Sequence, residues 1–453
     1  MYNPLLQPDL KLMLQENDEL GLCEFCNVLY PVVVAEVLDG MEPDEVWRVL
    51  NACDVHRRAE IFEFIVPHQQ MDLVESVDKK ELSRLIEAMA PDDRVDLLEN
   101  MPEEQVEALL PLVAQAERDD IRRLLSYPEG SAGSIMTTEY ASLPEDITVR
   151  EALDRLRQQA PNRETIYYVY VLDEKRRLDG VITLRQLILS RPTVVLVDLM
   201  RRNPVVVHVE DDKVEAARQL ARFDLLALPV VDDQNRLVGM ITHDDVLDVV
   251  QEEADEDAYR QSAIQPLEHS YFDTPLLEIA WKRGIWLMLL AFFALLTAGI
   301  QDLFDGVTES HKFLALFLPL VLASGGNTGS QSATLVIRAI AVAVMDRHAR
   351  FQLARREFLT GLMLGSCLAL FSFVSIHWIF GQTVMESAVV AATIGMVVTM
   401  GTLTGSMLPL VFKHIGMDPA IMSNPLIAAL SDMLGVVIYY TIASLVLDRI
   451  LAG

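Results

Sequence analysis

The sequence is poor in positive charge. It contains 37 Lys and Arg residues against 66 Asp and Glu residues, which gives a formal net charge of −29 at pH 7. The whole excess of acid lies in residues 1–275, because residues 276–453 hold 10 basic and 10 acidic residues. Proteins that bind nucleic acid present basic patches to its phosphates, so this charge balance argues against a nucleic-acid partner.

Cysteine is scarce as well, with Cys23, Cys26, Cys53 and Cys367 in 453 residues. The spacing Cys23-x-x-Cys26 with Cys53-x-x-His56 resembles a metal-binding knuckle, but the helical, acidic surroundings favour reduced cytosolic thiols. The sequence does not decide between the two interpretations. The N-terminus also lacks the basic flank and apolar core of a secretory signal, so we expect the first half of the chain in the cytosol.

Long apolar runs begin only near Leu276, where the composition changes from charged to apolar. We therefore expect a soluble acidic half followed by a membrane half. The predicted fold class is a multidomain α and α/β membrane protein. Its expected parts are a helical superhelix (residues 1–130), a pair of similar α/β domains (131–253), a linker helix (254–274) and a five-helix membrane domain (275–453).

The first 130 residues show helical periodicity alone, for example at Val46, Val49 and Leu50. A Pro followed by acids recurs after Met41, Met89 and Met101. Pro at the first helical position with acids in the first turn is typical of a helix start. The pattern predicts short helices stacked as a superhelix. The acids are capping residues by default, although three of them are dense enough for a second role: Asp92, Asp93 and Asp96.

Two stretches, residues 171–183 and 230–242, repeat each other at an offset of 59 residues. Each contains two β-rich runs around an acidic turn, which resembles a tandem pair of CBS domains. Such pairs often bind adenine nucleotides through a Thr/Ser-x-x-Asp ending. The second repeat has Thr242-x-x-Asp245, whereas the first has Arg185-Gln186 after Thr183. We therefore expect ATP binding to be weak, with Arg185 and Thr242 as its residues.

Acids crowd the segment that follows the second repeat, from Asp244 to Asp257. Like charges this close repel one another unless cations neutralise them. A solvated helix face is the default interpretation. Its position just before the membrane half favours a cation-binding role instead.

Five apolar segments follow, and each meets the length of about 20 residues needed to cross a bilayer, the first only marginally. Basic residues gather in the loops that would then face the cytosol, which places the N-terminus inside and the C-terminus outside a cytoplasmic membrane. The segments are residues 284–301, 313–337, 358–385, 387–412 and 419–447.

The fifth segment carries one charge, Asp432, near its middle. A carboxylate at membrane depth faces either a basic partner or a water-filled path, and no Lys or Arg lies inside the other segments. The second segment is interrupted by small and polar residues from Ala323 to Gln331. The pattern Gly325-x-x-x-Gly329 fits helix packing, while Asn327 and its polar neighbours fit a face turned toward a pore.

An acidic helical array, a CBS pair and five spans with Gly-Gly-Asn-Thr-Gly and Asn-Pro-Leu-x-x-x-x-Ser-Asp together resemble the MgtE family of bacterial magnesium channels. The resemblance covers essentially the whole chain. It implies a homodimer in the lipid bilayer whose central pore passes Mg²⁺ and closes when cytosolic Mg²⁺ binds regulatory acids. It implies an ion pathway at Asp432, Asn424, Ala428, Gly325, Gly326 and Asn327. The regulatory acids it implies are Asp92, Asp93, Asp96, Asp224, Asp245, Asp248, Glu256, Asp257 and Asp418.

Two alternatives remain open from the sequence. A secondary transporter of divalent cations would also use interrupted helices. A membrane-anchored metal or nucleotide sensor would use its spans only as an anchor, which Asp432 and the Gly-Gly-Asn stretch argue against. No nucleophile with a base and no hydrolytic metal constellation stands out, so we do not expect an enzyme.

Overall fold

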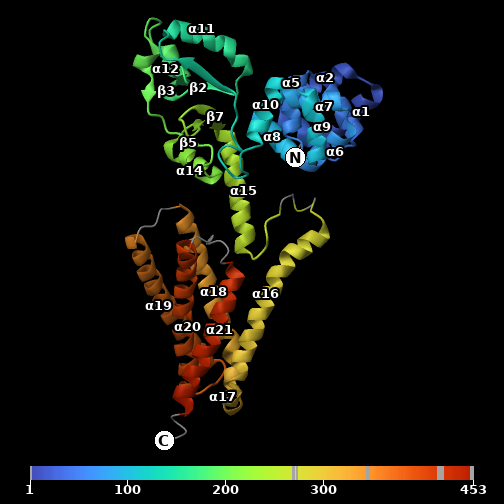
Figure 1. The fold of residues 1–453 in the computed structure, drawn as a ribbon. Helices are drawn as coiled ribbons and strands as arrows, with labels where there is room; N and C mark the ends of the chain where they lie inside the picture. The colour runs from blue at the N-terminus through green and yellow to red at the C-terminus, as the bar shows by residue number, and fades with distance from the viewer. Residues whose placement is uncertain (1–2, 268–270, 272–273, 343–346, 416–422, 449–453) are drawn as a thin grey trace. The chain divides into compact units, whose positions relative to one another are not determined.

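The computed structural model describes residues 3–267, 271, 274–342, 347–415 and 423–448. The chain divides into two compact units, Met1–Glu252 and Glu253–Gly453. The first is mixed in structure and the second is helical (Figure 1).

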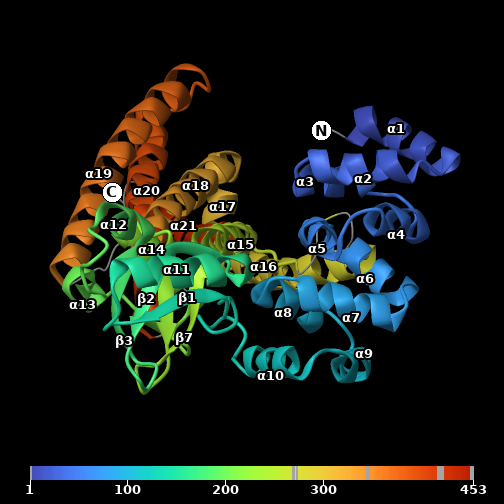
Figure 2. The ribbon, with the colours of Figure 1, turned by 90° about the horizontal axis from the view of Figure 1, so that it is seen from above.

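The N-terminal part of the first unit is an array of short helices (Figure 2). Four of them begin at a proline in the first turn, which ends the preceding segment and starts the next helix. Most of the helices pack on the next but one, as α3 does on α1 and α5 does on α3, so the predicted stacking of short helices is confirmed. The helices are α1 (Asn3–Glu16), α2 (Glu19–Val28), α3 (Pro31–Leu38), α4 (Pro43–Asn51), α5 (Val55–Glu63), α6 (Pro67–Ser76), α7 (Lys79–Ala88), α8 (Pro91–Glu99), α9 (Glu103–Leu109) and α10 (Gln115–Leu124), with a 3-10 turn at Leu110–Leu112.

Two small sheets follow, one for each sequence repeat. The first has the strand order β1-β2-β3-β4 and the second β5-β6-β7, each with a parallel pair and then an antiparallel pair. The strands are β1 (Tyr140–Pro144), β2 (Thr165–Leu172), β3 (Leu178–Thr183), β4 (Arg201–Arg202), β5 (Val207–His208), β6 (Ala227–Val231) and β7 (Leu237–Thr242). The helices are α11 (Val149–Gln159), α12 (Leu184–Leu189), α13 (Leu196–Leu199), α14 (Lys213–Phe223) and α15 (His243–Gln261), with a 3-10 turn at Ala160–Asn162.

The two repeats are joined by equivalent contacts. Arg201, just after Met200, pairs with Val181 of the first sheet, and Thr137, just after Met136, bridges to β7 of the second. A Cβ at the equivalent glycines of β3 and β7, 59 residues apart, would lie within 3 Å of a methionine sulfur. The repeat predicted from the sequence is therefore a pseudo-symmetric pair. α15 continues without a break past residue 253, where we expected a domain boundary.

The second unit contains five helices that are long and apolar enough to cross a membrane, as expected from the sequence. The small and polar stretch from Ala323 to Gln331 does not interrupt its helix, because α18 runs unbroken through it and satisfies its own backbone. The expectation of an interrupted second span was wrong in this respect. The helices are α16 (Leu276–Asp302), α17 (Asp305–Ser310), α18 (Phe313–Val342), α19 (Arg347–Trp378), α20 (Val384–His414) and α21 (Asn424–Ala443), with a π turn at Ser444–Asp448.

α18, α20 and α21 form the centre of this unit, and α19 packs on the outside of α20. The most apolar 18-residue window of α16 has no buried residue, against 56% buried in α20. α16 packs on α21, and its Trp286, Leu290 and Phe293 contact an apolar cluster of α18 and α21. Many of its other apolar side chains are exposed, among them Leu287, Phe292 and Leu295. Figure 1 shows the path of the helix. An apolar surface of this size suits lipid or another protein chain.

Candidate functional site

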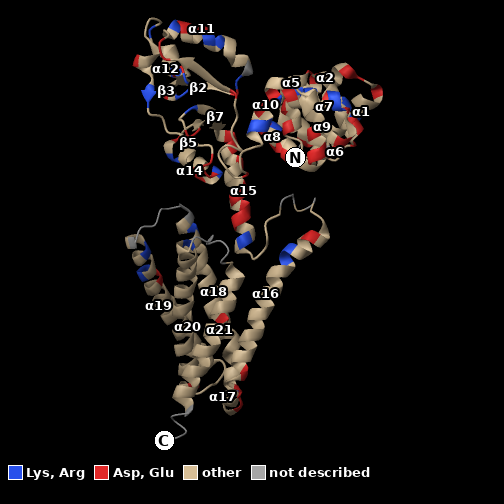
Figure 3. Cartoon of the chain, viewed as in Figure 1, with Lys and Arg blue, Asp and Glu red and all other residues tan. Residues whose placement is uncertain are grey.

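A line of three residues on α21 forms the first candidate site. Asp432 is the single charged residue of this helix, which is otherwise apolar (Figure 3). Ala428 and Asn424 precede it by four and eight residues, so all three lie along one side of α21. Each is half-buried. The structure thus aligns the three residues of the fifth span that the sequence assigned to the ion pathway.

The backbone of α18 lies directly against this line. A Cβ placed on Gly326 would be 3.3 Å from the Cβ of Ala428 and 3.4 Å from Oδ1 of Asp432. Gly326 therefore lets the carboxylate lie beside the helix backbone. Asn327, its neighbour in the predicted pathway, has an exposed side chain on a different side of α18.

Two hydroxyl groups of α18 bind Asn424. Ser330 Oγ donates to the backbone carbonyl of Asn424 at 3.0 Å, and Thr334 Oγ1 donates to its Oδ1 at 3.2 Å. The two residues are four apart, so they share one face of α18. The sequence analysis missed both, because their partner lies 90 or more residues away.

Close helix packing explains the other glycines of this region. A Cβ on Gly401 of α20 would lie 2.6 Å from the Gly325 carbonyl oxygen, and one on Gly405 only 2.1 Å from that of Gly329. No larger residue fits there without moving a helix. The packing interpretation of the glycine stretch is supported, because its glycines lie against α20 and α21. A polar face turned toward a pore stays a prediction.

A second candidate site lies in the first unit, where the helical array meets the CBS pair. Val95 and Leu124 of the array share one apolar core with Val246 and Val249 of α15. This contact brings acids of both parts together. We call them the acidic cluster, and its members are Glu63, Asp92, Asp93, Asp96, Glu164, Asp245 and Asp248.

Asp92 and Asp93 of α8 form the centre of the acidic cluster. Burial, and then the charge of Asp245, raise the pKa of Asp92 well above its usual value. The same two causes raise the pKa of Asp93 to about 6. Asp92 Oδ1 is buried without a hydrogen-bond partner in the part of the chain that the structure describes. An orphaned carboxylate oxygen among other acids is a ligand that a cation can satisfy.

Asp245 and Asp248 approach this centre from α15. The backbone N–H of Thr242 donates to Asp245 Oδ2 at 3.1 Å, and the Thr242 hydroxyl donates to the same oxygen. Burial nevertheless raises the pKa of Asp245. Burial and Glu252 raise the pKa of Asp248. The hydrogen bonds fix Asp245 in place but do not compensate for the loss of water.

The sequence analysis missed two members of the acidic cluster. Glu63 ends α5, and its Oε1 accepts a hydrogen bond from the backbone N–H of Ala90 at 3.3 Å. Burial and Asp93 raise its pKa to about 8. Glu164 lies just before β2, where burial and Asp245 raise its pKa to about 7. Both are isolated acids in the sequence, so no local pattern singles them out.

Of the predicted acids not yet described, Asp96 belongs to the acidic cluster and the others lie outside it. Asp96 is on α8, where burial and Asp93 raise its pKa, although its side chain reaches solvent. Asp224 ends α14 in a left-handed conformation and is exposed. Glu256 forms an ion pair with Arg260 one turn later on α15. Asp257 is also on α15, and Asp418 lies outside the described residues.

Neither the acids nor the cysteines form a preformed chelating site. Within the described ranges, no three His, Cys, Asp or Glu side chains converge as they would to ligate one ion. Cys26 and Cys53 are buried, and their thiols donate to the backbone carbonyls of Val49 and Leu50. A cation in the acidic cluster would therefore be held by pairs of carboxylates and its own water.

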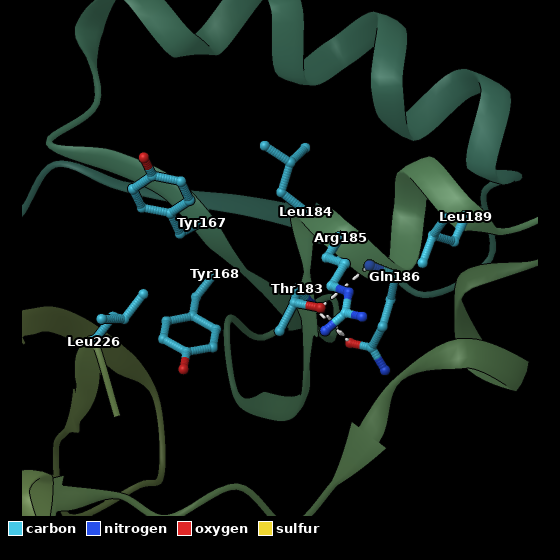
Figure 4. Close-up of a pocket in the computed structure, with 8 residues that line it drawn as sticks. All are labelled: Tyr167, Tyr168, Thr183, Leu184, Arg185, Gln186, Leu189 and Leu226. Atoms are coloured by element: carbon cyan, nitrogen blue, oxygen red, sulfur yellow. Dashed lines mark hydrogen bonds between the residues drawn. The ribbon is translucent and has the colours of Figure 1, made fainter. Parts of the chain in front are cut away.

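A pocket of about 460 Å³ opens on the first CBS repeat (Figure 4). Arg185 lines it, together with Tyr167 and Tyr168, whereas Thr242 does not. Gln186 Oε1 accepts hydrogen bonds from the N–H and the hydroxyl of Thr183, at 2.8 and 2.9 Å. The Gln186 side chain is thus occupied in capping α12 and presents no carboxylate to a ligand.

Comparisons with known proteins agree with this architecture. Three family models match: "MgtE intracellular N domain" over residues 29–130, "CBS domain" over 132–191 and 196–252, and "Divalent cation transporter" over 318–442. The magnesium transporter MgtE of Thermus thermophilus is 39% identical over 331 residues, which are 73% of each chain. That of Bacillus subtilis is 38% identical over 72% of this chain and 71% of its own. The chain belongs to the MgtE family.

Two solved structures resemble the soluble half. The soluble part of a magnesium transporter has a TM-score of 0.53 and 31% identity, and covers 55% of this chain and 98% of its own. The cytosolic domain of the Mg²⁺ channel MgtE in complex with ATP has a TM-score of 0.51 and 35% identity, and covers 54% of this chain and 99% of its own. The helical N-terminal domain and CBS pair predicted from the sequence are confirmed.

Proposed function

We propose that this protein is a magnesium channel of the cytoplasmic membrane, which imports Mg²⁺ through a dimeric pore. The observation that carries the proposal is Asp432, a carboxylate inside an apolar helix and against the backbone of Gly326. Its family relatives are named as magnesium transporters. A lone carboxylate at this depth is a cation site rather than a packing residue.

The chemistry of Mg²⁺ favours a hydrated site of this kind. The ion prefers octahedral oxygen ligands and gives up its water reluctantly. The Asp432 carboxylate can accept hydrogen bonds from water molecules that remain bound to the ion. One carboxylate balances half of the charge, and two-fold symmetry is the commonest way to supply a second. We therefore place one Asp432 from each of two copies around the pathway, next to Asn424 and Ala428.

Closure by cytosolic Mg²⁺ is the second part of the proposal. The acidic cluster joins the helical array to the CBS pair, and its carboxylates repel one another when ionised. A divalent ion that binds only the docked arrangement stabilises it by its differential affinity. Glu256, Asp257 and Asp418 extend the acidic surface toward the membrane half in the sequence. We propose that residues 254–274 carry the closing movement to the pore.

The orientation of the chain across the membrane is inferred from the positions of its basic residues. Lys282 and Arg283 flank the start of the first span, and a group of five arginines from Arg338 to Arg356 flanks the loop after the second. Positive residues favour the cytosolic side. We therefore propose that both soluble domains lie inside and the C-terminus outside.

Ion flux through purified protein in liposomes tests the pathway. We expect Asp432→Ala to reduce Mg²⁺ flux at least a hundredfold, because the pathway loses its only charge. Glu386→Ala is the matched control, since Glu386 caps α20 at its end and lies outside the pathway. Single-channel recording of the wild type should show large unitary currents. Flux unchanged in Asp432→Ala would refute the site, and flux without unitary currents would favour a carrier.

A further inference from the structure

Glu357 is the single acidic residue of α19, and it lies in the first third of the candidate span His348–Trp378, directly before the apolar segment that begins at Phe358. The ion pathway described above does not use it. A carboxylate within such a span normally has a function or a specific partner. The partner here is Ser332 of α18, whose Oγ donates a hydrogen bond to Glu357 Oε2 at 2.5 Å. Ser332 is only 4% exposed and Glu357 is half-buried, so this bond is partly shielded from its surroundings.

Ser332 stands midway between the two α18 residues that bind Asn424. Ser330 and Thr334 share one face of α18, and at 100° per residue Ser332 points about 200° away from each of them. α18 is therefore bonded to α21 on one side and to α19 on nearly the opposite side. The residues that make these bonds, Ser330, Ser332 and Thr334, are every second residue of one short stretch of α18.

The other contacts of α18 are apolar or bond its backbone: Leu314, Phe317 and Val321 pack into the core of the unit, and Tyr439 and Lys413 donate hydrogen bonds to the carbonyls of Leu314 and Ile340. α19 packs on α20, and α20 packs on α18 through Gly401 and Gly405. Glycine contacts let two helices approach closely but offer no side chain that resists rotation of one about its axis. A hydrogen bond to a carboxylate is both directional and strong. The bond from Ser332 to Glu357 therefore adds a directional constraint on the rotation of α18 at this level, on the side away from Asn424.

We propose that Glu357 and Ser332 are a positioning pair for the ion pathway. They hold α18 at the rotation that keeps Gly326 against Asp432 and keeps the Ser330 and Thr334 hydroxyls on Asn424. Neither residue touches the ion. The proposal rests on the proposed function of α18 and α21 as the ion pathway.

The test compares Mg²⁺ and Co²⁺ flux of the full-length protein in liposomes. Ser332→Ala and Glu357→Ala should each change the ratio of the two fluxes about tenfold, as expected for the loss of a bond to a charged group. The double variant should change it no further, because both substitutions remove one interaction. Glu357→Gln keeps an acceptor oxygen and should restore most of the ratio. Ser366→Ala is the control, since Ser366 is exposed on α19 and bonds to its own helix.

The thermal midpoint of each purified variant separates positioning from folding. A lower midpoint with an unchanged flux ratio would show a merely structural bond and overturn the proposal. A double variant whose flux ratio differs about a hundredfold from that of the wild type would show that the two residues act independently, and this result would also overturn the proposal. If the Glu357→Ala variant does not insert into the membrane, the flux ratio of Ser332→Ala decides between a positioning and a structural role, because this substitution deletes only a hydroxyl group. Asp432→Ala in the same assay tests the pathway itself: loss of flux there with normal ratios in the other variants rejects the positioning pair alone.

Discussion

Neutralising Asp93 is the most direct test of the acidic cluster. This residue of α8 is half-buried, and the charges of Asp245, Asp244 and Asp248 across the contact add to the effect of burial. Together they raise its pKa from 3.8 to about 6. Asp93→Asn keeps the size and removes the charge, so it isolates the electrostatic contribution.

The direction in which pH changes the docking equilibrium follows from proton binding. A carboxyl group with a raised pKa binds its proton more tightly when the array is docked on the CBS pair than when it is free. Docking is therefore favoured at low pH and loses stability as the pH rises from about 4 through about 6. Above that range the cost is constant. The amide introduced by Asp93→Asn cannot ionise, so the variant should show a flatter dependence on pH.

The size of the effect on docking follows from the same shift in the pKa of Asp93. A change from 3.8 to about 6 corresponds to roughly 3 kcal/mol at 1.36 kcal/mol per pKa unit. Asp93 is partly exposed, and solvent screening reduces this value. We expect Asp93→Asn to favour the docked arrangement by about 1–3 kcal/mol at pH 7.5 without divalent ions. This is a factor of roughly 5 to 150 in the docking equilibrium.

Small-angle X-ray scattering of residues 1–261 measures this equilibrium. In EDTA the wild type should have a larger radius of gyration at pH 7.5 than at pH 5, and the Asp93→Asn variant should show a smaller increase over the same range. Millimolar Mg²⁺ should compact the wild type and leave little difference between the two proteins. Asp72→Asn, which changes an exposed acid of α6, should behave as the wild type. Identical curves for Asp93→Asn and wild type in EDTA would refute the electrostatic account of docking.

Two further substitutions test other parts of the structure. Gly405→Ala places a Cβ 2.1 Å from the Gly329 carbonyl oxygen, so we expect the free energy of unfolding to fall by about 1–3 kcal/mol and Mg²⁺ flux to be reduced. Gly299→Ala is the control, because Gly299 has open space around it, and it should change neither the thermal midpoint nor the flux. Gln186→Asp supplies the carboxylate that the first CBS pocket lacks, and calorimetry should show about tenfold tighter ATP binding. Tight ATP binding by the wild type that disappears on substitution of Arg185 or Gln186 would contradict the second prediction.

The sequence predicted those parts of the fold that have local signals. Prolines with acids in the next turn marked the starts of α4 and α8. The 59-residue repeat identified the CBS pair, and apolar length identified the five spans. Asp432 stood out as the lone charge of an apolar segment, whereas Asn424 and Ala428 were named through the family resemblance, and the structure places all three on one side of α21. Each of these features depends on residues close together in the chain.

Features that depend on distant contacts were not predictable in this way. Glu63 joins the acidic cluster through the start of α8, 27 residues later. Ser330 and Thr334 reach Asn424 across two helices of the sequence. The unbroken α18 shows a limit of composition-based reasoning, because glycines that would weaken an isolated helix are tolerated where neighbouring helices pack against them.

The two candidate sites place carboxylates in different surroundings, and this difference assigns them different tasks. Asp432 is a single acid beside the backbone of α18 at Gly326, so in the proposed pathway its position is fixed by helix packing and can favour one hydrated ion over another. The acidic cluster contains several acids that raise one another's pKa, and in the described residues no three of them converge on one point. Such a cluster responds to the charge that a cation brings more than to its preferred geometry, because the ion keeps much of its own water. We therefore expect the ion pathway to select magnesium and the cluster to report the total concentration of divalent cations.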